Sequence, residues 1–467
     1  MKRVFKEVGT LDRKCYEEYL LTEDILMEHA AEALKREVEN FPKQSRVLIV
    51  SGPGNNGADG ITLARMLKGD YEVVLYLPYG AKSKMAKLQL ERAKKVSVRE
   101  AKLDEIEGEF DIVIDSIFGS GMNRDLDDEI VSLIEFLNSL NSYKIACDIP
   151  TGIKEDGTFS KAVFRADVTV TMGALKESLF GDAAKDFVGE IKVADLGVAS
   201  SLYENESSTF LLEKSDLKLP LRDKKNVNKG TFGHLAVICG KKHGAAVIAS
   251  KAAFAFGCGL VTLVCNEIFD IPYEIMYSSH LPNKTTAVCI GMGLGYQYDD
   301  ELLHDFVLNH DLPVIIDADL FYNDFIVEIL EKKDNLVLTP HPKEFSSLLE
   351  ITGVAKADVK EIQSHRFDFV REFCKKYPNV VLLLKGANTL IAQGERLFIN
   401  PYGTNALSKG GSGDVLSGLI GSLLAQNYLP LEAAIHGSLA HSLSALKFDK
   451  NNYALTPLDL IEGVKCL

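Results

Sequence analysis

Residues 46–68 read RVLIVSGPGNNGADGITLARMLK, and this stretch decides the fold class of the chain. An apolar run, Arg46–Val50, leads through a turn rich in glycine and asparagine into a helical pattern over Ile61–Lys68. A continuous apolar run indicates a strand of a parallel sheet that is covered on both faces. The glycines permit positive φ and close backbone approach, while amides at the start of a helix attract anions. The stretch therefore predicts a strand–turn–helix unit that binds a phosphate-bearing ligand, the alternative being a plain glycine-rich turn with a helix cap.

The same alternation of apolar runs and helical patterns recurs along the chain. In the first half the further expected elements are strands over Tyr71–Leu77, Asp111–Ile117, Tyr143–Ile149 and Asp167–Met172 and a helix over Glu129–Leu140. In the second half they are strands over His234–Cys239, Leu260–Cys265, Ala287–Ile290, Val314–Ile316, Leu336–Leu338, Val380–Leu384 and Thr389–Ile391 and helices over Asp414–Gln426 and Leu431–Phe448. This pattern predicts two doubly wound α/β domains with parallel sheets. A polar stretch over residues 199–229 separates them, so we expect domains over residues 1–208 and 215–467.

The composition of the chain limits the kinds of partner that it can have. Of its 467 residues 46% are hydrophobic and 25% charged, which is the balance of a globular protein. The formal net charge is −14 and no basic patch is segregated, so we expect no nucleic-acid partner. The longest apolar stretch, Ala245–Cys265, is interrupted by Lys251 and by two glycines. It predicts a buried helix followed by a strand, and no membrane partner.

The cysteines and the first residues indicate the compartment. Eight cysteines are scattered without a CxxC pair and lie mostly in apolar runs. They predict reduced core residues, and neither a disulfide framework nor a zinc framework. The first residues, MKRVFKEVGTLDRKCYEEY, include basic side chains but no apolar run, which argues against a signal peptide. We therefore expect a cytoplasmic protein.

Acidic residues end two further apolar runs of the first half. Asp115 precedes SIFGSG and Asp148 precedes IPTG. A carboxylate at such a place costs free energy unless it is hydrogen-bonded, bound to a metal or catalytic. In open parallel sheets ligands bind beyond the carboxyl ends of the strands, so we expect both acids and the turn over residues 52–60 to form one site. The alternative for each aspartate alone is a simple loop cap.

The turn GPGNNGADG (52–60) and the strand end CDIPTG (147–152) resemble the YjeF N-terminal family of NAD(P)H-hydrate epimerases over about residues 1–205. The resemblance implies a Rossmann-like domain that interconverts the R and S epimers of hydrated NADH and NADPH. It implies that Asp148 is catalytic and that a potassium ion, a hard cation that oxygen ligands suit, is held by Asn56, Asp115 and Thr151. It also implies substrate binding by Asn55, Asn56, Gly57, Ala58, Asp59, Gly119, Ser120, Gly121, Met122, Asn123, Arg124, Asp125 and Asp148.

Two residues of this half leave alternatives open. The family more often has serine at the position of Thr151, but threonine keeps the hydroxyl. Lys176 follows another strand end, where it would either assist Asp148 or lie solvated at the surface.

The sharpest signal of the second half is SKGGSGDVLSG (408–418), which opens a long apolar helix. At the start of a helix, glycines and a serine leave backbone amides free, and these amides together with the helix dipole stabilise the negative charge of a phosphate. Asp414 lies beside them in the sequence. The pattern resembles the ribokinase-like superfamily, in which this aspartate takes a proton from an attacking hydroxyl. Superfamily membership alone leaves the substrate open.

Five further segments narrow the resemblance. They are KGTFGH (229–234), HGAA (243–246), GMGLG (291–295), LTPHPKEF (338–345) and KGANT (385–389). Together they resemble the ADP-dependent NAD(P)H-hydrate dehydratases from about residue 215 to the end. Two departures are Met292, where the family usually has proline, and Lys343, where it usually has glycine.

This second resemblance implies catalysis by Asp414 and binding of the S hydrate by Ala245, Gly293, Gly295, His341 and Asp414. The implied nucleotide-binding residues are Lys385, Gly386, Ala387, Asn388, Thr389, Thr404, Asn405, Ala406, Leu407, Ser408, Lys409, Gly410, Gly411, Ser412 and Gly413. His341, between two prolines, has a second interpretation as an ordinary loop residue.

The combined resemblance implies a bifunctional repair enzyme. ADP is the expected co-substrate, Mg²⁺ accompanies it in the second domain, and NAD(P)H, AMP and phosphate are the expected products. The expected partners are the small molecules NADHX, NADPHX and ADP, with a homo-oligomer of this chain. The alternatives are a kinase of a small alcohol with a regulatory first half, and a first half that is a non-catalytic scaffold, which the acids Asp115 and Asp148 disfavour.

Overall fold

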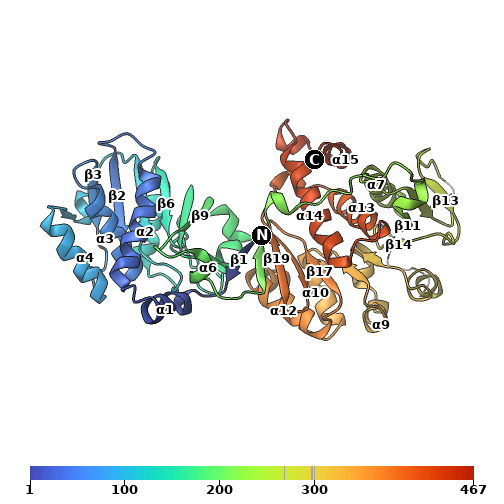
Figure 1. Cartoon of the computed structure of the whole chain (residues 1–467), viewed down its shortest axis with the longest axis horizontal. Helices are drawn as coiled ribbons and strands as arrows, with labels where there is room; N and C mark the ends of the chain where they lie inside the picture. Colours follow the sequence, from blue (N-terminus) through green and yellow to red (C-terminus); the bar gives the residue numbers. More distant parts are fainter. Residues whose placement is uncertain (268, 296–297, 299) are drawn as a thin grey trace. The chain divides into compact units, whose positions relative to one another are not determined.

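We describe a computed structural model of the chain that covers residues 1–267, 269–295, 298 and 300–467. The chain divides into two compact units (Figure 1). One comprises Arg3–Ser207, and the other comprises Met1–Lys2 with Ser208–Leu467. The break between Ser207 and Ser208 falls within the polar stretch over residues 199–229.

The N-terminal unit is built on a parallel sheet with the strand order β4-β3-β2-β5-β6-β7-β9. Its strands are β2 (Arg46–Ser51), β3 (Glu72–Tyr76), β4 (Glu100–Ala101), β5 (Ile112–Ser116), β6 (Tyr143–Cys147), β7 (Val168–Met172) and β9 (Glu190–Ala194). Its helices are α1 (Gly9–Glu18), α2 (Glu23–Val38), α3 (Asn55–Leu67), α4 (Lys84–Lys95), α5 (Asp128–Ser139) and α6 (Ser200–Tyr203). Outside this sheet β1 (Lys2–Phe5) pairs in parallel with β8 (Leu175–Lys176).

Both faces of this sheet are buried. Val47 and Ile49 of β2 point into a core shared with α2 and α3, while Leu48 and Val50 point into a second core shared with α5. Because side chains alternate along a strand, a run that is apolar at every position fits a sheet covered on both faces.

The C-terminal unit has the strand order β13-β12-β11-β14-β15-β16-β17-β18-β19-β10. The strands are β10 (Thr209–Leu211), β11 (His234–Ile238), β12 (Leu260–Val264), β13 (Met276–Ser278), β14 (Ala287–Ile290), β15 (Val314–Ile316), β16 (Leu336–Leu338), β17 (Val381–Leu384), β18 (Thr389–Gln393) and β19 (Arg396–Asn400). The helices are α7 (His243–Ala255), α8 (Asp300–Leu303), α9 (Phe325–Lys332), α10 (Pro342–Ile351), α11 (Val359–Ser364), α12 (Arg366–Lys376), α13 (Ser412–Ala425), α14 (Pro430–Leu446) and α15 (Pro457–Val464). Helices α7 and α14 flank α13 on the sheet.

The expectation of an entirely parallel second sheet is wrong at one edge. Strands β13 to β17 are parallel, but β18 is antiparallel to both β17 and β19. The pair Gln393 and Arg396 closes a hairpin with Gly394 at φ +58° in its two-residue loop. So short a loop can join only antiparallel neighbours, because a parallel pair needs a crossover of a dozen or more residues.

Three further expectations can be compared with the structure. The stretch Ala245–Cys265 forms α7 and then β12, which confirms the buried helix and strand. Helix α3 begins at Asn55 and not at Ile61, so the whole asparagine-rich segment lies in its first turns. Within the described residues there is no helix whose length and apolar character would let it cross a membrane.

Candidate active sites

The turn between β2 and α3 is tightly packed against its own backbone and against the end of β5. A Cβ on Gly57 would lie 1.9 Å from the carbonyl oxygen of Gly52, and one on Gly60 would lie 1.9 Å from Ser116 Oγ. The expected close approach is therefore correct. The freedom to adopt positive φ, which glycine also permits, is not used by the four glycines of the turn. The tight packing holds the first turn of α3 at the carboxyl end of the sheet.

A cavity of about 690 Å³ opens beyond this turn. Its lining includes the expected residues Asn55, Asn56, Asp59, Gly119, Ser120, Gly121, Met122, Asn123, Arg124, Asp125 and Asp148. Four other expected residues are not in the lining: Gly57 and Ala58 are buried in α3, and Asp115 and Thr151 are buried beneath the cavity. Asp12 also lines the cavity, and no signal in its own sequence neighbourhood indicated it.

Asp148 follows β6 with a φ of +68°, a strained conformation for a residue with a side chain. Its Oδ2 accepts a hydrogen bond from the Ser120 amide at 2.9 Å, and its Oδ1 lies 2.7 Å from Lys176 Nζ. Burial alone would raise the pKa of Asp148, but the Lys176 ammonium and the amides of Ser120 and Met172 outweigh it, so the pKa is lowered. Asp148 is therefore a carboxylate at neutral pH. Lys176 is 1% exposed, so its interpretation as a surface lysine is wrong.

Two other carboxyl groups of the cavity have a raised pKa, in contrast to Asp148. Burial, and then the charge of Asp148, raise the pKa of Asp59 well above its ordinary value. Burial also raises the pKa of Asp12, although Tyr203 Oη donates a hydrogen bond to its Oδ1 at 2.7 Å. Carboxyl groups whose pKa values move apart in one cavity can divide the roles of acid and base. The cavity thus combines Asp148, whose pKa is lowered, with Asp59, whose pKa is raised.

Asp115 and Thr151 form a buried pair under the cavity. The Thr151 hydroxyl and amide each donate to Asp115 at 2.7 Å, and the Phe118 amide donates to Thr151 Oγ1 at 3.1 Å. Burial nevertheless raises the pKa of Asp115 to about 6. Asn56 Nδ2 is buried without a hydrogen-bond partner in the described structure. The Thr151 hydroxyl, the Asp115 carboxylate and the amide oxygen of Asn56 are oxygen atoms of the kind that ligate a hard cation.

The second site lies at the start of α13. Gly411 caps the helix at φ +88°, and a Cβ there would lie 2.6 Å from Pro457 Cγ, so glycine is required. Asp414, in the first turn, is partly buried, and this burial together with the charges of Asp317 and Asp319 raises its pKa to about 6. The backbone amides of a first helical turn lack intrahelical partners, so this turn offers free N–H groups close to the carboxyl of Asp414.

An ion-pair network that the sequence analysis missed lies beside Asp414. Lys385 Nζ lies 2.8 Å from Asp317 Oδ1 and 3.6 Å from Glu344 Oε2, and Ser417 of α13 donates to Asp317 Oδ2 at 2.8 Å. Burial alone would lower the pKa of Lys385, yet the two carboxylates raise it. Asp317 directly follows β15, so the signal used for Asp115 and Asp148 could have found it.

Besides Asp414 of α13, the residues expected to bind the hydrate lie in the first turn of α7, in the segment after β14 and at the start of α10. His341 caps α10, its Nδ1 accepting from the amides of Lys343 and Glu344 at 3.1 and 3.2 Å, while its side chain remains 44% exposed. A Cβ on Gly293 would lie 3.3 Å from Ala245 Cβ, which brings those two loops together. The Gly295 amide donates to Asp319 Oδ2 at 2.9 Å beside a small cavity of about 60 Å³.

The residues expected to bind the nucleotide lie on two segments that meet. Lys385 to Thr389 connects β17 to β18, and a Cβ on Gly403 would lie 2.4 Å from the Ala387 carbonyl oxygen. The segment from Thr404 to Gly413 then leads into α13, and Lys409 Nζ donates to the Tyr453 carbonyl at 2.7 Å. Of the two departures from the family pattern, Met292 is buried in the core and Lys343 is exposed.

Two family models match the chain. A model described as YjeF-related protein N-terminus matches residues 23–178, and a model described as NAD(P)H-hydrate dehydratase matches residues 235–465. The chain is 47% identical over 478 positions to the bifunctional NAD(P)H-hydrate repair enzyme Nnr of Helicobacter pylori, with 100% of each chain covered. It is 32% identical to the protein of the same name from Dictyoglomus turgidum, which covers 98% of this chain and 96% of that one.

A solved structure that resembles part of the chain is an ADP/ATP-dependent NAD(P)H-hydrate dehydratase from Bacillus subtilis, co-crystallised with ATP and Mg²⁺. The identity is 29% and the TM-score 0.45, and the match covers 53% of this chain and 92% of that chain.

Proposed function

The chain belongs to the family of bifunctional NAD(P)H-hydrate repair enzymes, and from this premise we propose how its two units divide the work. Its fold is the expected one, two α/β units of the YjeF and ribokinase-like kinds. Residues 1–208 form the epimerase domain, which interconverts the R and S hydrates. Residues 215–467 form the dehydratase domain, which returns the S hydrate to NADH or NADPH with ADP as co-substrate.

One observation carries this assignment. Each unit places a buried aspartate against a lysine just beyond the carboxyl ends of its strands. Asp148 pairs with the buried Lys176 at 2.7 Å, and Asp317 pairs with Lys385, whose side chain is 21% exposed, at 2.8 Å. A buried ion pair costs desolvation free energy and is weak support for stability. Two such pairs, each next to a further carboxyl with a raised pKa, therefore support two sites that move protons.

In the epimerase domain, the hydrate lies in the 690 Å³ cavity with its nucleotide phosphates at the first turn of α3. Asp148, ionised by its contact with Lys176, accepts a proton from the substrate. Burial and the charge of Asp148 raise the pKa of Asp59, which suits that carboxyl group to supply the proton that the second step requires. Lys176 does not touch the substrate; it is a positioning residue that keeps Asp148 charged.

A potassium ion fits the base of this cavity. Asn56, Asp115 and Thr151 would hold it through an amide oxygen, a carboxylate and a hydroxyl, all of which suit a hard cation. Burial raises the pKa of Asp115 to about 6 although Thr151 donates two hydrogen bonds to it, and a bound cation would favour its ionised form. When bound, the ion would supply positive charge beside the buried carboxylate of Asp115.

In the dehydratase domain, the reaction must overcome the fact that hydroxide is a poor leaving group from the hydrated ring. Asp414 takes the proton of the substrate hydroxyl, which attacks the terminal phosphoryl group of ADP and releases AMP. The amides of Gly411 to Gly413 stabilise the charge that develops on the phosphoryl oxygens. The ring nitrogen then expels phosphate, and loss of a proton from the neighbouring ring carbon restores the double bond of NADH or NADPH.

Mg²⁺ fits the same place. Burial, and then the charges of Asp317 and Asp319, raise the pKa of Asp414, so three carboxyl groups lie close together and a hard divalent cation would balance their charge. When bound, Mg²⁺ neutralises the phosphates of the nucleotide. Lys385 and the segment that ends at Gly413 bind and orient that nucleotide.

Two variants test the division of labour, and each serves as the control for the other. Asp148→Ala should abolish epimerisation while the S hydrate is still dehydrated at the wild-type rate. Asp414→Asn should lower ADP-dependent dehydration by a factor of about 10² or more while epimerisation and hydrate binding persist. Loss of both activities in a folded single variant would contradict two independent sites, and full dehydration by Asp414→Asn would contradict the role of that residue.

A further inference from the structure

Three side chains with metal-ligating atoms meet at a place that the proposed mechanism does not use. Strands β11 and β12 are parallel neighbours, and Ile238 lies opposite Val264 in their register. The next residues, Cys239 and Cys265, therefore leave the two strands at the same level. The Cys239 amide still donates to the Val264 carbonyl at 2.9 Å, which fixes this alignment. His243 begins α7 directly after the connecting turn.

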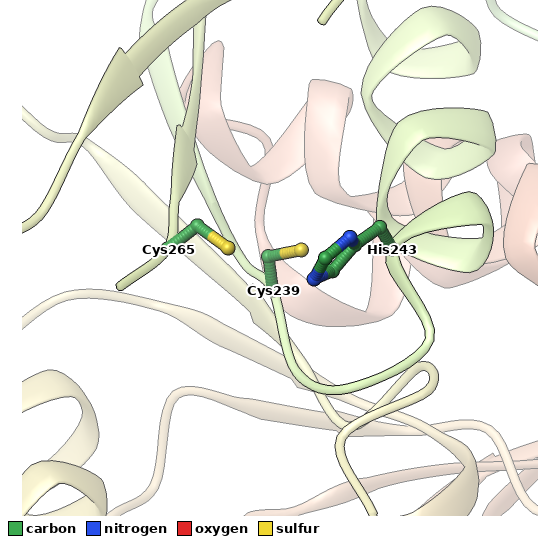
Figure 2. A group of neighbouring side chains, drawn as sticks. All are labelled: Cys239, His243 and Cys265. Atoms are coloured by element: carbon green, nitrogen blue, oxygen red, sulfur yellow. The ribbon is translucent and has the colours of Figure 1, made fainter. Parts of the chain in front are cut away.

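The ligand atoms of Cys239, His243 and Cys265 all lie within 4.8 Å of one another (Figure 2). In a tetrahedral zinc site, bonds of about 2.3 Å to sulfur and 2.0 Å to nitrogen place the ligand atoms about 3.6–3.8 Å apart. Small side-chain rotations are thus enough to close the group around an ion. Both thiols are buried, with Cys239 4% exposed, so the ion would sit in a shielded environment.

The imidazole of His243 is held in place by two neighbours. Phe269 stacks on it with the ring centroids 4.1 Å apart and the planes at 11°. Glu267 Oε2 lies 4.0 Å from His243 Nε2, so a carboxylate stands beside the ring. A carboxylate next to a ligating histidine orients the ring and increases its basicity.

We propose that Cys239, His243 and Cys265 bind a thiophilic divalent metal ion of the Zn²⁺ class. Two thiolates and one imidazole form a set of soft and borderline ligands, which selects such ions over Mg²⁺ and K⁺. The fourth position is open to water or to Glu267. This proposal departs from the expectation drawn from the sequence, which treated the cysteines as separate core residues.

The position of the site gives it a consequence for the second domain. The turn Gly240–Lys242 joins Cys239 to His243, and a Cβ on Gly293 would lie 2.6 Å from the Lys242 carbonyl oxygen. Ala245, one turn into α7, faces the same Gly293. A bound ion would therefore fix the loop on which the proposed hydrate-binding residues Ala245 and Gly293 rest.

The test uses the full chain, reduced and stripped with a chelator, and titrated with Zn²⁺ against a chromophoric chelator. We expect one ion per chain with a Kd below about 1 µM, and a thiolate-to-metal charge-transfer band when Co²⁺ replaces Zn²⁺. Cys239→Ser and Cys265→Ser should each weaken binding more than about 100-fold and lose that band. Cys258→Ser is the matched control, because Cys258 is buried in the same core at the other end of β12.

Circular dichroism and thermal unfolding in chelator show whether each variant is folded before its metal binding is compared. Weak or absent binding by the wild type, a cobalt spectrum without the thiolate band, or unchanged binding by the folded Cys239→Ser and Cys265→Ser variants would overturn the proposal.

Discussion

At the scale of single residues, Asp148 is ionised because Lys176 lies 2.7 Å away in a buried pocket. Lys176→Met removes the ammonium and leaves the burial, which raises the pKa of a carboxyl. Since the base must be unprotonated, we expect the acidic limb of the kcat/KM profile for epimerisation to move up by at least about one pH unit. The exposed Lys161, which pairs with Asp128, provides the control Lys161→Met. An unmoved limb in the folded variant would show that Lys176 does not govern Asp148.

The pKa of Asp414 leads to a prediction about the pH dependence of dehydration. Its pKa is raised to about 6, chiefly by burial, so it is protonated below that pH and ionised above it. A base works only when it is ionised, so kcat/KM for ADP-dependent dehydration should rise with pH through about 6. The initial rate with S hydrate and ADP, measured at low substrate over this range, checks the prediction. A rate that falls as the pH rises from about 5 to 7 would exclude Asp414 as the base.

At the scale of elements, helix propensity and packing predict opposite effects on stability for one substitution in the turn between β2 and α3. Propensity alone predicts that Gly57→Ala stabilises a helix by up to about 1 kcal/mol. The structure predicts destabilisation by about 1–3 kcal/mol, because the new Cβ would lie 1.9 Å from the Gly52 carbonyl oxygen. Gly54→Ala, whose Cβ would meet no atom within 4 Å, should stay near the wild type.

Denaturant unfolding, followed through the loss of epimerase activity, compares these two glycine variants with the wild type. A Gly57→Ala variant as stable as Gly54→Ala would mean that the turn is not packed as described.

The central strands could be predicted from sequence because they are continuous apolar runs, and β14, β15 and β16 begin and end at the expected residues. The start of α3 could not, because asparagines and glycines have low helix propensity and only tertiary packing stabilises that first turn. Strands β10 and β19 were also missed. They are short or part of a hairpin, so they lack the strand–helix alternation on which the prediction relied.

At the scale of the whole molecule, the sites join residues that are far apart in the sequence. Asp12 and Tyr203 form a hydrogen bond at the edge of one cavity, although 191 positions separate them. Motifs identify residues that carry a local signature, such as Asp148 and Asp414, but a partner supplied by tertiary structure has no such signature. Cys239 and Cys265 illustrate the same limit, since only the register of β11 and β12 brings them together.

Joining both activities in one chain has a chemical reason. A dehydratase that accepts only the S hydrate leaves the R hydrate unrepaired, whereas an epimerase in the same molecule supplies S from R. The two units therefore complete a repair that neither completes alone, and the whole epimer mixture is the proper substrate for a test.

The most direct test of this account is absorbance at the reduced-nicotinamide band after the full chain is mixed with an R and S mixture of NADH hydrate. The mixture is followed with ADP and without nucleotide. We predict complete recovery of NADH with ADP and none without it. No recovery with ADP, from protein that binds the hydrate, would contradict the account, and recovery of only the S fraction would contradict the epimerase role of the first unit.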